Sequence, residues 1–504
     1  MKSFKVPFSL PLFLLVVVFS CQKKEETKPN IIYILADDLG IGDVSAFNDS
    51  SLIKTTNIDR LAIEGVRFTD AHSGSAVCTP TRYGILTGRY SWRGVLKKGV
   101  TWSYDTCIVE PGRLTVGTLL QTAGYETASI GKWHLGMNWA AADTGNIPVD
   151  FSQKLNPSPN SYGFDYFFGI PASLDIPPYV YVENDEVTAL PNRMTQDTSA
   201  FGWWRLGPTG SDFTHQEVLP TFFEKARSFI SQKRDKPFFL YLPLSAPHTP
   251  ILPDENNEGQ SGLNEYADFV LMIDGLVGQL MNELEKQGLE SNTMIVFASD
   301  NGCAPYADVE GLEEKGHRPS MNYRGYKADI YEGGHRIPLI IKWNGHFEAG
   351  KVVDATNCLT DFMATVADLN GVKIPENAAE DSFSLLPLLT GQEEFLRRNT
   401  IHHSVDGNFA IRHGDWKLIM APGSGGWSYP RAGKEPKDAP KAQLFNLKSD
   451  PGERENLVEK EKEQYEFLRT QLMQVIKNGR SNDGPAQGYV NVENWPGMNW
   501  TMEL

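Results

Sequence analysis

A cysteine and an arginine lie four residues apart at the start of a predicted helix. Residues 78–88 read CTPTRYGILTG. Pro80 suits the first turn of a helix, and Thr79 before it can cap that helix. Cys78 would then lie just outside a helix N-terminus, where unpaired N–H groups and the helix dipole favour an anion, with Arg82 on the same face. The stretch predicts a nucleophile beside a positively charged site, and a buried structural cysteine is the alternative.

Two carboxylates follow the first predicted strand. Residues 30–36 form a continuous apolar run, which is typical of a parallel strand that is buried on both faces. The run ends in Asp37 and Asp38. Adjacent carboxylates repel each other, and a bound cation relieves the repulsion. The pair therefore indicates a cation site, with a solvated turn as the alternative.

Three further predicted strands also end in polar side chains. They are 125–130, which precedes Lys132 and His134; 237–242, which precedes His248; and 293–298, which precedes Asp300 and Asn301. In an open parallel sheet, ligands bind outside the carboxyl ends of the strands, so all four groups should meet at one edge. The oxygen atoms of Asp37, Asp38, Asp300 and Asn301 are ligands for calcium or magnesium rather than for zinc.

Length and charge limit the class of protein. A chain of 504 residues with 40% apolar and 22% charged residues suggests one large globular domain and a smaller one. The formal net charge of −16 argues against nucleic acid or an anionic membrane as a partner. An anionic substrate must then be attracted by a local basic pocket. The five cysteines form no C-x-x-C pair and suggest neither a zinc site nor a disulfide framework.

The start of the chain predicts export. Two lysines precede an apolar run over residues 6–20, which is typical of a signal sequence and too short for a stable membrane-spanning helix. Residues 18–21, VFSC, resemble a bacterial lipobox, which implies lipidation of Cys21 and anchoring in the outer membrane, at the cell surface or in the periplasm of a Gram-negative bacterium. Plain signal cleavage is the alternative, because Phe19 is uncommon at its place in the box.

Four segments follow from these patterns. We expect a signal peptide over 1–20, a tether over 21–28, a catalytic domain over 29–398, and a C-terminal subdomain over 399–504 in which short strands alternate.

The motifs together resemble the type I sulfatases of the alkaline-phosphatase-like superfamily. Residues 78–82 match the signature Cys-x-Pro-Ser/Thr-x-Arg, residues 131–134 match Gly-Lys-Trp-His, and residues 332–338 match Glu-Gly-Gly-x-Arg-x-Pro. The resemblance runs in order through residues 29–457. It implies an α/β/α sandwich with a mostly parallel sheet and a small C-terminal antiparallel sheet with a helix. It also implies hydrolysis of a sulfate monoester and a maturation enzyme that converts Cys78 to formylglycine.

The resemblance assigns a role to each candidate residue. Cys78, as the formylglycine hydrate, would be the nucleophile and also a metal ligand. The other ligands of one Ca²⁺ ion, or of Mg²⁺, would be Asp37, Asp38, Asp300 and Asn301. Charge on the transferring group would be stabilised by Arg82, Lys132 and Lys327. His248 would protonate the leaving alkoxide and His134 would remove a proton from the second hydroxyl. Further candidate substrate contacts are His317, Arg318 and His335.

Export and an irregular aromatic stretch over residues 140–214 favour a sulfated polysaccharide. Tyr179, Tyr181, Trp203 and Trp204 could stack on sugars, although at least half of them are expected to pack the loop. The chain around 74–93 and 327–338 looks like sulfatases of glycosaminoglycan hexosamines or of algal polysaccharides such as ulvan. Two alternatives stay open: a formylglycine-dependent phosphonate or phosphodiester hydrolase, and a non-catalytic glycan-binding lipoprotein whose Cys78 is never matured.

Overall fold

The computed structural model describes the chain except for residues 6, 8–27, 144–146, 393–394, 491–495 and 502–504. The predicted lipidation site, Cys21, lies outside the described residues. Within those residues, no helix combines the length and the apolar character that a bilayer span requires.

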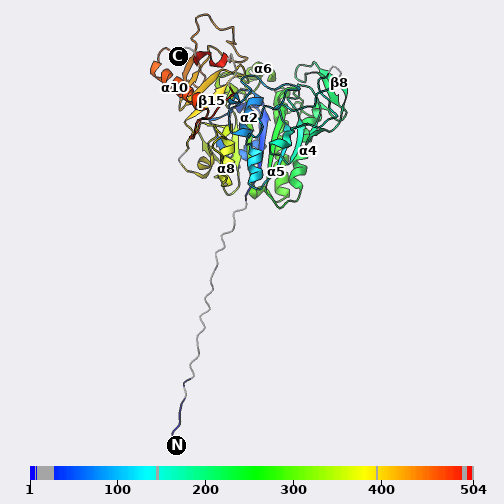
Figure 1. The fold of residues 1–504 in the computed structure, drawn as a ribbon, viewed down its shortest axis with the longest axis vertical. Coiled ribbons are helices and arrows are strands. Elements are labelled where there is room, and N and C mark those ends of the chain that lie inside the picture. Colours follow the sequence, from blue (N-terminus) through cyan, green and yellow to red (C-terminus); the bar gives the residue numbers. More distant parts are fainter. Residues whose placement is uncertain (6, 8–27, 144–146, 393–394, 491–495, 502–504) are drawn as a thin grey trace.

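A mixed sheet of ten strands forms the centre of the molecule (Figure 1). Strands β11, β1, β10, β4 and β5 are neighbours in that order and run parallel, whereas β12 is antiparallel to β11. From one edge to the other the strands are β13 (Lys351–Val353), β2 (Val66–Phe68), β12 (Leu339–Lys342), β11 (Thr293–Ser299), β1 (Asn30–Asp37), β10 (Phe238–Pro247), β4 (Glu126–Lys132), β5 (Tyr166–Ile170), β6 (Val182–Glu183) and β7 (Glu186–Val187). The predicted strands at 30–36, 125–130, 237–242 and 293–298 are confirmed.

Helices cover both faces of this sheet. Alternate residues of β1 belong to two separate apolar clusters: Ile32 and Ile34 pack on one side, and Ile31 and Tyr33 on the other. The first cluster includes side chains of α1 (Thr56–Glu64), α4 (Val218–Ser231) and α5 (Glu265–Lys286). The second includes side chains of α2 (Cys78–Thr87), α3 (Val116–Thr122), α8 (Phe362–Leu369) and α9 (Leu386–Thr390). Burial on both faces explains why the central strands have no polar alternation.

The helices begin in different ways. The Thr115 side chain caps α3 by accepting from the Thr118 amide, and the Asn264 side chain caps α5 in the same way from Ala267. The prediction for α2 was wrong in detail. Cys78 is the first residue of the helix, and Thr79 lies inside it, where its hydroxyl accepts from the Thr101 amide.

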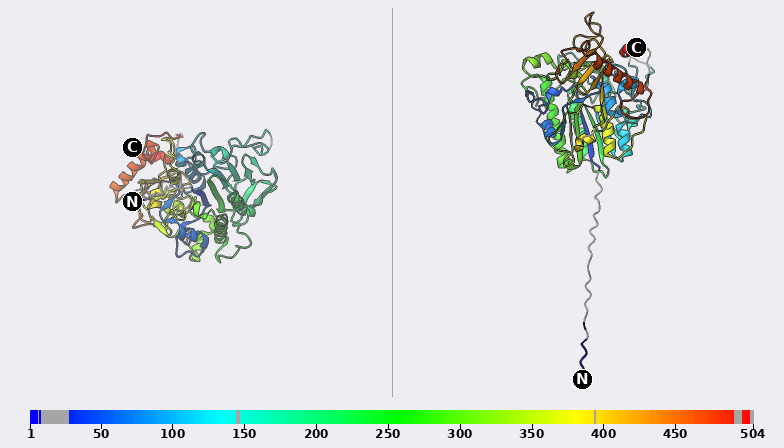
Figure 2. Two further views of the ribbon diagram at one scale, coloured as in Figure 1. Left: turned by 90° about the horizontal axis from the view of Figure 1, so that it is seen from below. Right: turned by 90° about the vertical axis from the view of Figure 1, so that its left-hand side faces the viewer.

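The C-terminal subdomain is a four-stranded antiparallel sheet with a long helix. Its strands are β15 (Asn399–His403), β16 (Phe409–His413), β17 (Trp416–Ile419) and β18 (Gln443–Asn446), and its helix is α10 (Lys462–Asn478). Apolar side chains of α10 join those of the sheet in one cluster. Figure 2 shows this subdomain at the end of the molecule opposite the entry of the chain into β1, which is the end that the carboxyl ends of the central strands face.

The stretch 140–214 is more regular than the sequence predicts. It contains β5, β6 and β7 and a separate hairpin of β8 (Pro191–Asp197) and β9 (Trp204–Gly210). Together with α6 (Val309–Glu314), this hairpin lies at the same end of the molecule as the strand ends (Figure 1). The short helix α7 (Glu332–His335) precedes β12.

Candidate active site

Charged side chains from four adjacent strands meet at the carboxyl edge of the sheet. Asp37 is the last residue of β1, Lys132 the last of β4, and Asp300 and His248 directly follow β11 and β10. The carboxylates and Lys132 are fully buried, whereas His248 is 8% exposed. Lys327, from the loop before α7, joins them and is 4% exposed. The group therefore reaches solvent on the side of His248 and Lys327.

Three cations neutralise three carboxylates in this group. Nη2 of Arg82 lies 2.8 Å from Oδ2 of Asp300 and 3.6 Å from Oδ2 of Asp37. Lys132 forms an ion pair with the same Asp37 carboxylate. Nζ of Lys327 lies 2.7 Å from Oδ1 of Asp38. These pairs were not visible in the sequence, because the partners are between 45 and 289 residues apart.

The oxygen atoms of the group suit a hard divalent cation. Oδ1 of Asp37 and Oδ1 of Asn301 are buried and have no hydrogen-bond donor. The Asn301 side-chain amide donates to Oδ1 of Asp38, at 2.7 Å, and the Asp38 amide donates to Oδ1 of Asp300, at 3.2 Å. Burial and the neighbouring Asp37 carboxylate raise the pKa of Asp300 to about 7. A bound cation would satisfy the two free oxygens and would favour the ionised form of Asp300.

Hydrogen bonds from side chains outside the charged group stabilise the backbone turn that carries these carboxylates. Asp38 has a φ of 67°, a left-handed conformation that aspartate tolerates better than most residues. The Tyr266 hydroxyl donates to the Asp38 carbonyl and to Oδ2 of Asp43, at 3.2 and 2.6 Å. Asp43 in turn bonds Nε2 of His317 at 2.8 Å. Sequence reasoning missed Tyr266 and Asp43 as supports of the site, because nothing in their local pattern indicates the contact.

Cys78 lies next to the charged group at the start of α2. It is 2% exposed and a free thiol. Burial raises its pKa, and the positive charges of Lys132 and Lys327 oppose that shift only in part. An unmodified Cys78 therefore stays a protonated thiol at neutral pH, which is a weak nucleophile.

Two histidines complete the group, and each presents one ring nitrogen. Nε2 of His134 lies 3.0 Å from the Thr101 carbonyl, which can only accept, so Nε2 carries the hydrogen and Nδ1 is an acceptor, with the Ser173 hydroxyl 3.5 Å away. Nδ1 of His248 lies 2.5 Å from the Thr249 carbonyl, so Nε2 is its available nitrogen, 3.7 Å from Oδ2 of Asp38. Burial lowers the pKa of both rings, helped by Lys132 at His134 and by Lys327 at His248.

The three further candidate substrate contacts do not gather here. His317 is fully buried and bonded to Asp43, and His335 is fully buried in a separate cluster, so the structure places neither side chain in the charged group, and substrate contact by either one stays a prediction. The sequence could not show that their partners are 274 and 263 residues away. Arg318 is exposed and contacts Asn322, and its role stays a prediction.

Comparisons with known proteins give the family. The family model described as Sulfatase matches residues 29–372, and a second model, N-sulphoglucosamine sulphohydrolase C-terminal, matches residues 325–482. The chain belongs to the sulfatase family. It is therefore a sulfuric ester hydrolase, with the α/β sandwich and the small C-terminal antiparallel sheet that the resemblance implies.

Two relatives of this sulfatase carry similar names. The chain is 33% identical to an N-acetylgalactosamine-6-O-sulfatase of Bacteroides thetaiotaomicron over 490 residues, covering 89% of this chain and 93% of that protein. It is 29% identical to the human N-acetylgalactosamine-6-sulfatase over 496 residues, covering 94% and 89%. A solved sulfatase structure from work on glycosaminoglycan metabolism by B. thetaiotaomicron superimposes with a TM-score of 0.77 at 33% identity, covering 89% of this chain and 99% of that one.

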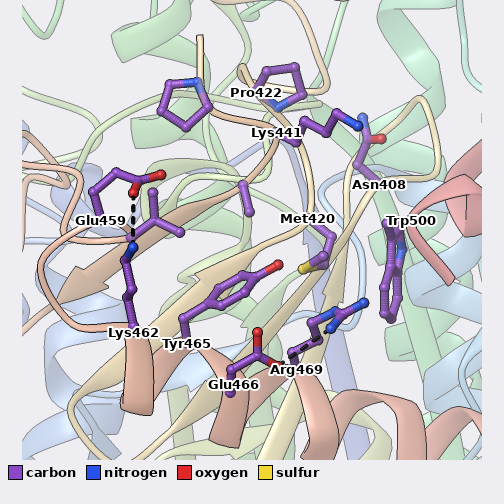
Figure 3. A pocket seen from close by; sticks show the side chains of 13 residues that line it. Asn408, Met420, Pro422, Lys441, Glu459, Lys462, Tyr465, Glu466, Arg469 and Trp500 are labelled. Atoms are coloured by element: carbon purple, nitrogen blue, oxygen red, sulfur yellow. Dashed lines mark hydrogen bonds and ion pairs between the residues drawn. The ribbon is translucent and has the colours of Figure 1, made fainter. Parts of the chain in front are cut away.

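A large cavity of this sulfatase lies away from the charged group. It has a volume of about 620 Å³ and lies between α10 and the loops of the C-terminal sheet. Figure 3 shows the ion pairs Lys462–Glu459 and Arg469–Glu466 on its walls. Its lining contains none of the residues predicted for chemistry, so the cavity does not compete with the strand edge as the active site.

The cluster around His335 is structural. Nδ1 of His335 lies 3.0 Å from Nδ1 of His72, and the ring of His402 stacks on that of His335 at a centroid distance of 3.8 Å and 9°. Two nearly parallel rings at this distance cannot direct their in-plane lone pairs at one ion, so these three histidines do not form a metal site. Lys417 donates to Glu332 at 3.0 Å and lies 3.0 Å from Nε2 of His335.

Acid should destabilise this sulfatase through the same cluster. Burial lowers the pKa of His72, His335 and His402, and the positive charge of Lys417 adds to the effect at the last two. As pH falls below about 6.5, the unfolded chain takes up protons on these histidines that the native state does not bind, so each histidine lowers the free energy of unfolding as the pH falls. We expect His402→Phe to keep the stack and to narrow the difference in Tm between pH 7.5 and pH 5.

The matched control is His346→Phe, because His346 also stacks on an aromatic ring but is exposed. Thermal unfolding of both variants at the two pH values checks the expectation. An equal narrowing in both variants, or in neither, would contradict it.

Proposed function

We propose that this sulfatase removes sulfate esters from a sulfated glycan by means of a formylglycine at position 78 and one bound Ca²⁺. The observation that carries the proposal is the pair of buried, unpartnered oxygens of Asp37 and Asn301 in a ring of cations beside Cys78. Hard oxygen ligands of this kind select calcium or magnesium. A bound Ca²⁺ would supply positive charge beside the sulfate oxygens and lower the pKa of a nearby hydroxyl.

The nucleophile requires chemical modification. The Cys78 thiol is buried with a raised pKa, and sulfur is a poor partner for a hard cation. Formylglycine, made by a maturation enzyme, would supply a hydrated aldehyde: one hydroxyl would attack sulfur and displace the sugar oxygen, and the second would lose a proton as the sulfate is expelled and the aldehyde re-forms. Family membership and the signature around Cys78 support this part of the proposal.

The surrounding cations would stabilise the transferring group. Arg82 is held rigidly, since its Nε and Nη2 bond Asp300 and its Nη1 donates to the Lys132 carbonyl at 2.9 Å. Lys327 lies on the side that reaches solvent. Preorganised positive charge in a dry site stabilises charge that develops in the transition state more than it would in water.

The two histidines would move protons at defined atoms. Nε2 of His248, whose Nδ1 is bonded to the Thr249 carbonyl, would protonate the departing sugar oxygen. Nδ1 of His134, whose Nε2 is bonded to the Thr101 carbonyl, would accept the proton from the second hydroxyl. Burial keeps His134 neutral, which is the state that a base requires.

The first substrate to test is an N-acetylgalactosamine 6-sulfate residue of a glycosaminoglycan. The support is that two relatives of this name match about nine-tenths of the chain. Sulfate release from ulvan oligosaccharides instead would identify the algal polysaccharide as the substrate. Faster hydrolysis of phosphodiesters than of sulfate esters would identify the protein as a phosphodiester hydrolase. The proposal includes export and a lipid anchor at Cys21, supported by the sequence of residues 1–21.

Removal of the metal tests the proposal. Dialysis against EDTA should lower the rate of sulfate release at least about 100-fold, because the site at Asp37 and Asn301 then lacks its cation. Addition of Ca²⁺ should restore the activity. In the variant Asn301→Ala, which lacks one of the unpartnered oxygens, half-restoration should require more Ca²⁺. Full activity in protein whose metal content is shown to be below stoichiometric by mass spectrometry would refute the calcium assignment.

A further inference from the structure

An arc of aromatic rings surrounds one arginine at the solvent side of the active site. The Arg205 guanidinium lies over the ring of Trp102 at 5.1 Å from its centroid and over that of Trp203 at 4.9 Å. Trp203 meets Tyr306 edge-on at 6.5 Å, and Tyr306 lies 5.6 Å from Trp427. Four segments that are remote in sequence thus form one continuous row of side chains.

Arg205 connects this aromatic arc (Trp102, Arg205, Trp203, Tyr306 and Trp427) to the histidine that faces the leaving group. Its Nη1 pairs with Oδ2 of Asp175 and donates to the Asp175 carbonyl at 3.2 Å. The other carboxylate oxygen of Asp175 is buried without a donor and lies 4.0 Å from Nδ1 of His248.

The two ends of the arc are attached to the active site as well. Trp102 directly follows Thr101, whose carbonyl accepts the hydrogen bond from His134. The Trp427 amide donates to Oδ1 of Asp329 at 2.8 Å, two residues after Lys327. The arc therefore borders the mouth of the site from the His134 side to the Lys327 side.

Two rings of the arc are exposed and the other two are half-buried, whereas two of the other aromatic candidates of the same insertion are buried. Trp102 is 49% and Tyr306 is 48% exposed. Tyr179 and Tyr181 are buried, and Trp204 stacks on His215 at 3.8 Å. Of the four aromatic residues that the sequence suggested for sugar stacking, only Trp203 belongs to the arc. Exposed aromatic clusters beside a site mark binding surfaces, and amphipathic rings suit the apolar faces of sugars.

Arg205 gives the arc a preference for negative charge. Its side chain is 40% exposed, and among the described residues only Nη1 donates a hydrogen bond to protein. Nε and Nη2 remain as a planar fork, which is the geometry that binds a carboxylate or a sulfate through two parallel hydrogen bonds. Its contacts with Trp102 and Trp203 hold this fork in place.

We infer that the aromatic arc is a second sugar subsite, which binds an anionic residue, a uronate or another sulfated sugar, next to the residue that loses its sulfate. The inference rests on the proposed function and refines it, because it makes an oligosaccharide rather than a monosaccharide the preferred substrate. Stacking would hold the sugar ring, and the Arg205 fork would bind its anionic group.

Paired substrates test this subsite. We compare a chondroitin 6-sulfate tetrasaccharide, which has a glucuronate beside the sulfated residue, with the monosaccharide N-acetylgalactosamine 6-sulfate. Trp203→Ala and Tyr306→Ala should each raise KM for the tetrasaccharide about tenfold, the effect of one lost stacking contact, and leave kcat/KM for the monosaccharide unchanged. Arg205→Lys keeps the charge beside Asp175 but removes the fork, so it should raise KM for the tetrasaccharide. It should not change KM for a tetrasaccharide whose carboxylates have been reduced to alcohols.

The control is Leu206→Ala, one residue further along β9 and 59% exposed. This variant should leave the KM and kcat/KM values for both substrates unchanged. Equal effects of the arc variants on both substrates, or no effect on either, would overturn the subsite. If wild-type enzyme releases no sulfate from either compound, the proposed substrate is wrong. A binding measurement then tests the subsite separately. Tryptophan fluorescence titration of Cys78→Ala protein with the tetrasaccharide should then show weaker binding when Tyr306→Ala is added, and unchanged or absent binding would overturn it.

Discussion

Replacing Cys78 with alanine should abolish sulfate release and lower kcat at least about 10,000-fold, which is typical when a covalent nucleophile is removed. The reason is that neither the proposed attack on sulfur nor the return to the aldehyde can occur without the modified side chain. The fold should survive, because the substitution removes one sulfur atom from the first residue of α2 and no hydrogen bond of the helix. Sulfate release and circular dichroism check the two halves of the expectation.

The matched control is Cys358→Ala. Cys358 is also buried and free, but it packs in the apolar cluster that α10 forms with the C-terminal sheet, together with Tyr90 and Trp92. This variant should retain activity. Mass spectrometry of the tryptic peptide 68–82 should show an aldehyde at position 78 in active wild-type protein. Substantial turnover by purified Cys78→Ala protein would refute the nucleophile assignment, and an unmodified thiol throughout would favour the glycan-binding alternative.

The sequence predicted the edge of the sheet that holds the site because of how parallel strands are buried. A strand such as β1 is covered on both faces, so it reads as an unbroken apolar run, and the first polar residue after it marks the strand end. Asp37, Lys132 and Asp300 were located in this way without any contact information. The rule that ligands bind at the carboxyl ends then placed them together.

Contacts between distant segments were beyond this reasoning. His317 and His335 are histidines in loops near site motifs, and the sequence predicted substrate contact for both. Their buried partners, Asp43 and His72, lie more than 260 residues away. Local pattern distinguishes a charged residue from an apolar one, but it does not distinguish a charge that faces solvent from one that is paired in the interior.

The insertion over 140–214 was underestimated for a different reason. Strand β8 exposes most of its residues and β9 contains two glycines and a proline, so neither shows an apolar alternation. Their pairing depends on tertiary packing rather than on intrinsic β-propensity. The same irregular sequence supplies Trp203 and Arg205 to the aromatic arc.

Replacing His248 with alanine should separate substrates by their leaving groups. A sugar alkoxide is a poor leaving group and needs a proton from Nε2 of His248, whereas 4-nitrophenolate leaves without one. We therefore expect His248→Ala to lower kcat about 100- to 10,000-fold on a sugar sulfate and far less on 4-nitrophenyl sulfate. The buried variant His402→Phe, in the separate histidine cluster around His335, serves as the control and should change the turnover of neither substrate.

The pH profile gives an independent readout of the same proton. Burial and the charge of Lys327 lower the pKa of His248, so its protonated, acidic form is present only below the ordinary histidine range. For wild-type enzyme, kcat/KM on the sugar sulfate should accordingly fall as pH rises through this lowered pKa, and His248→Ala should lack that decline. Equal losses on both leaving groups would mean that His248 binds the sulfate oxygens instead of protonating the leaving group. In that case, the proton must come from another group, and Lys327, the other site cation on the side that reaches solvent, is the next residue to test.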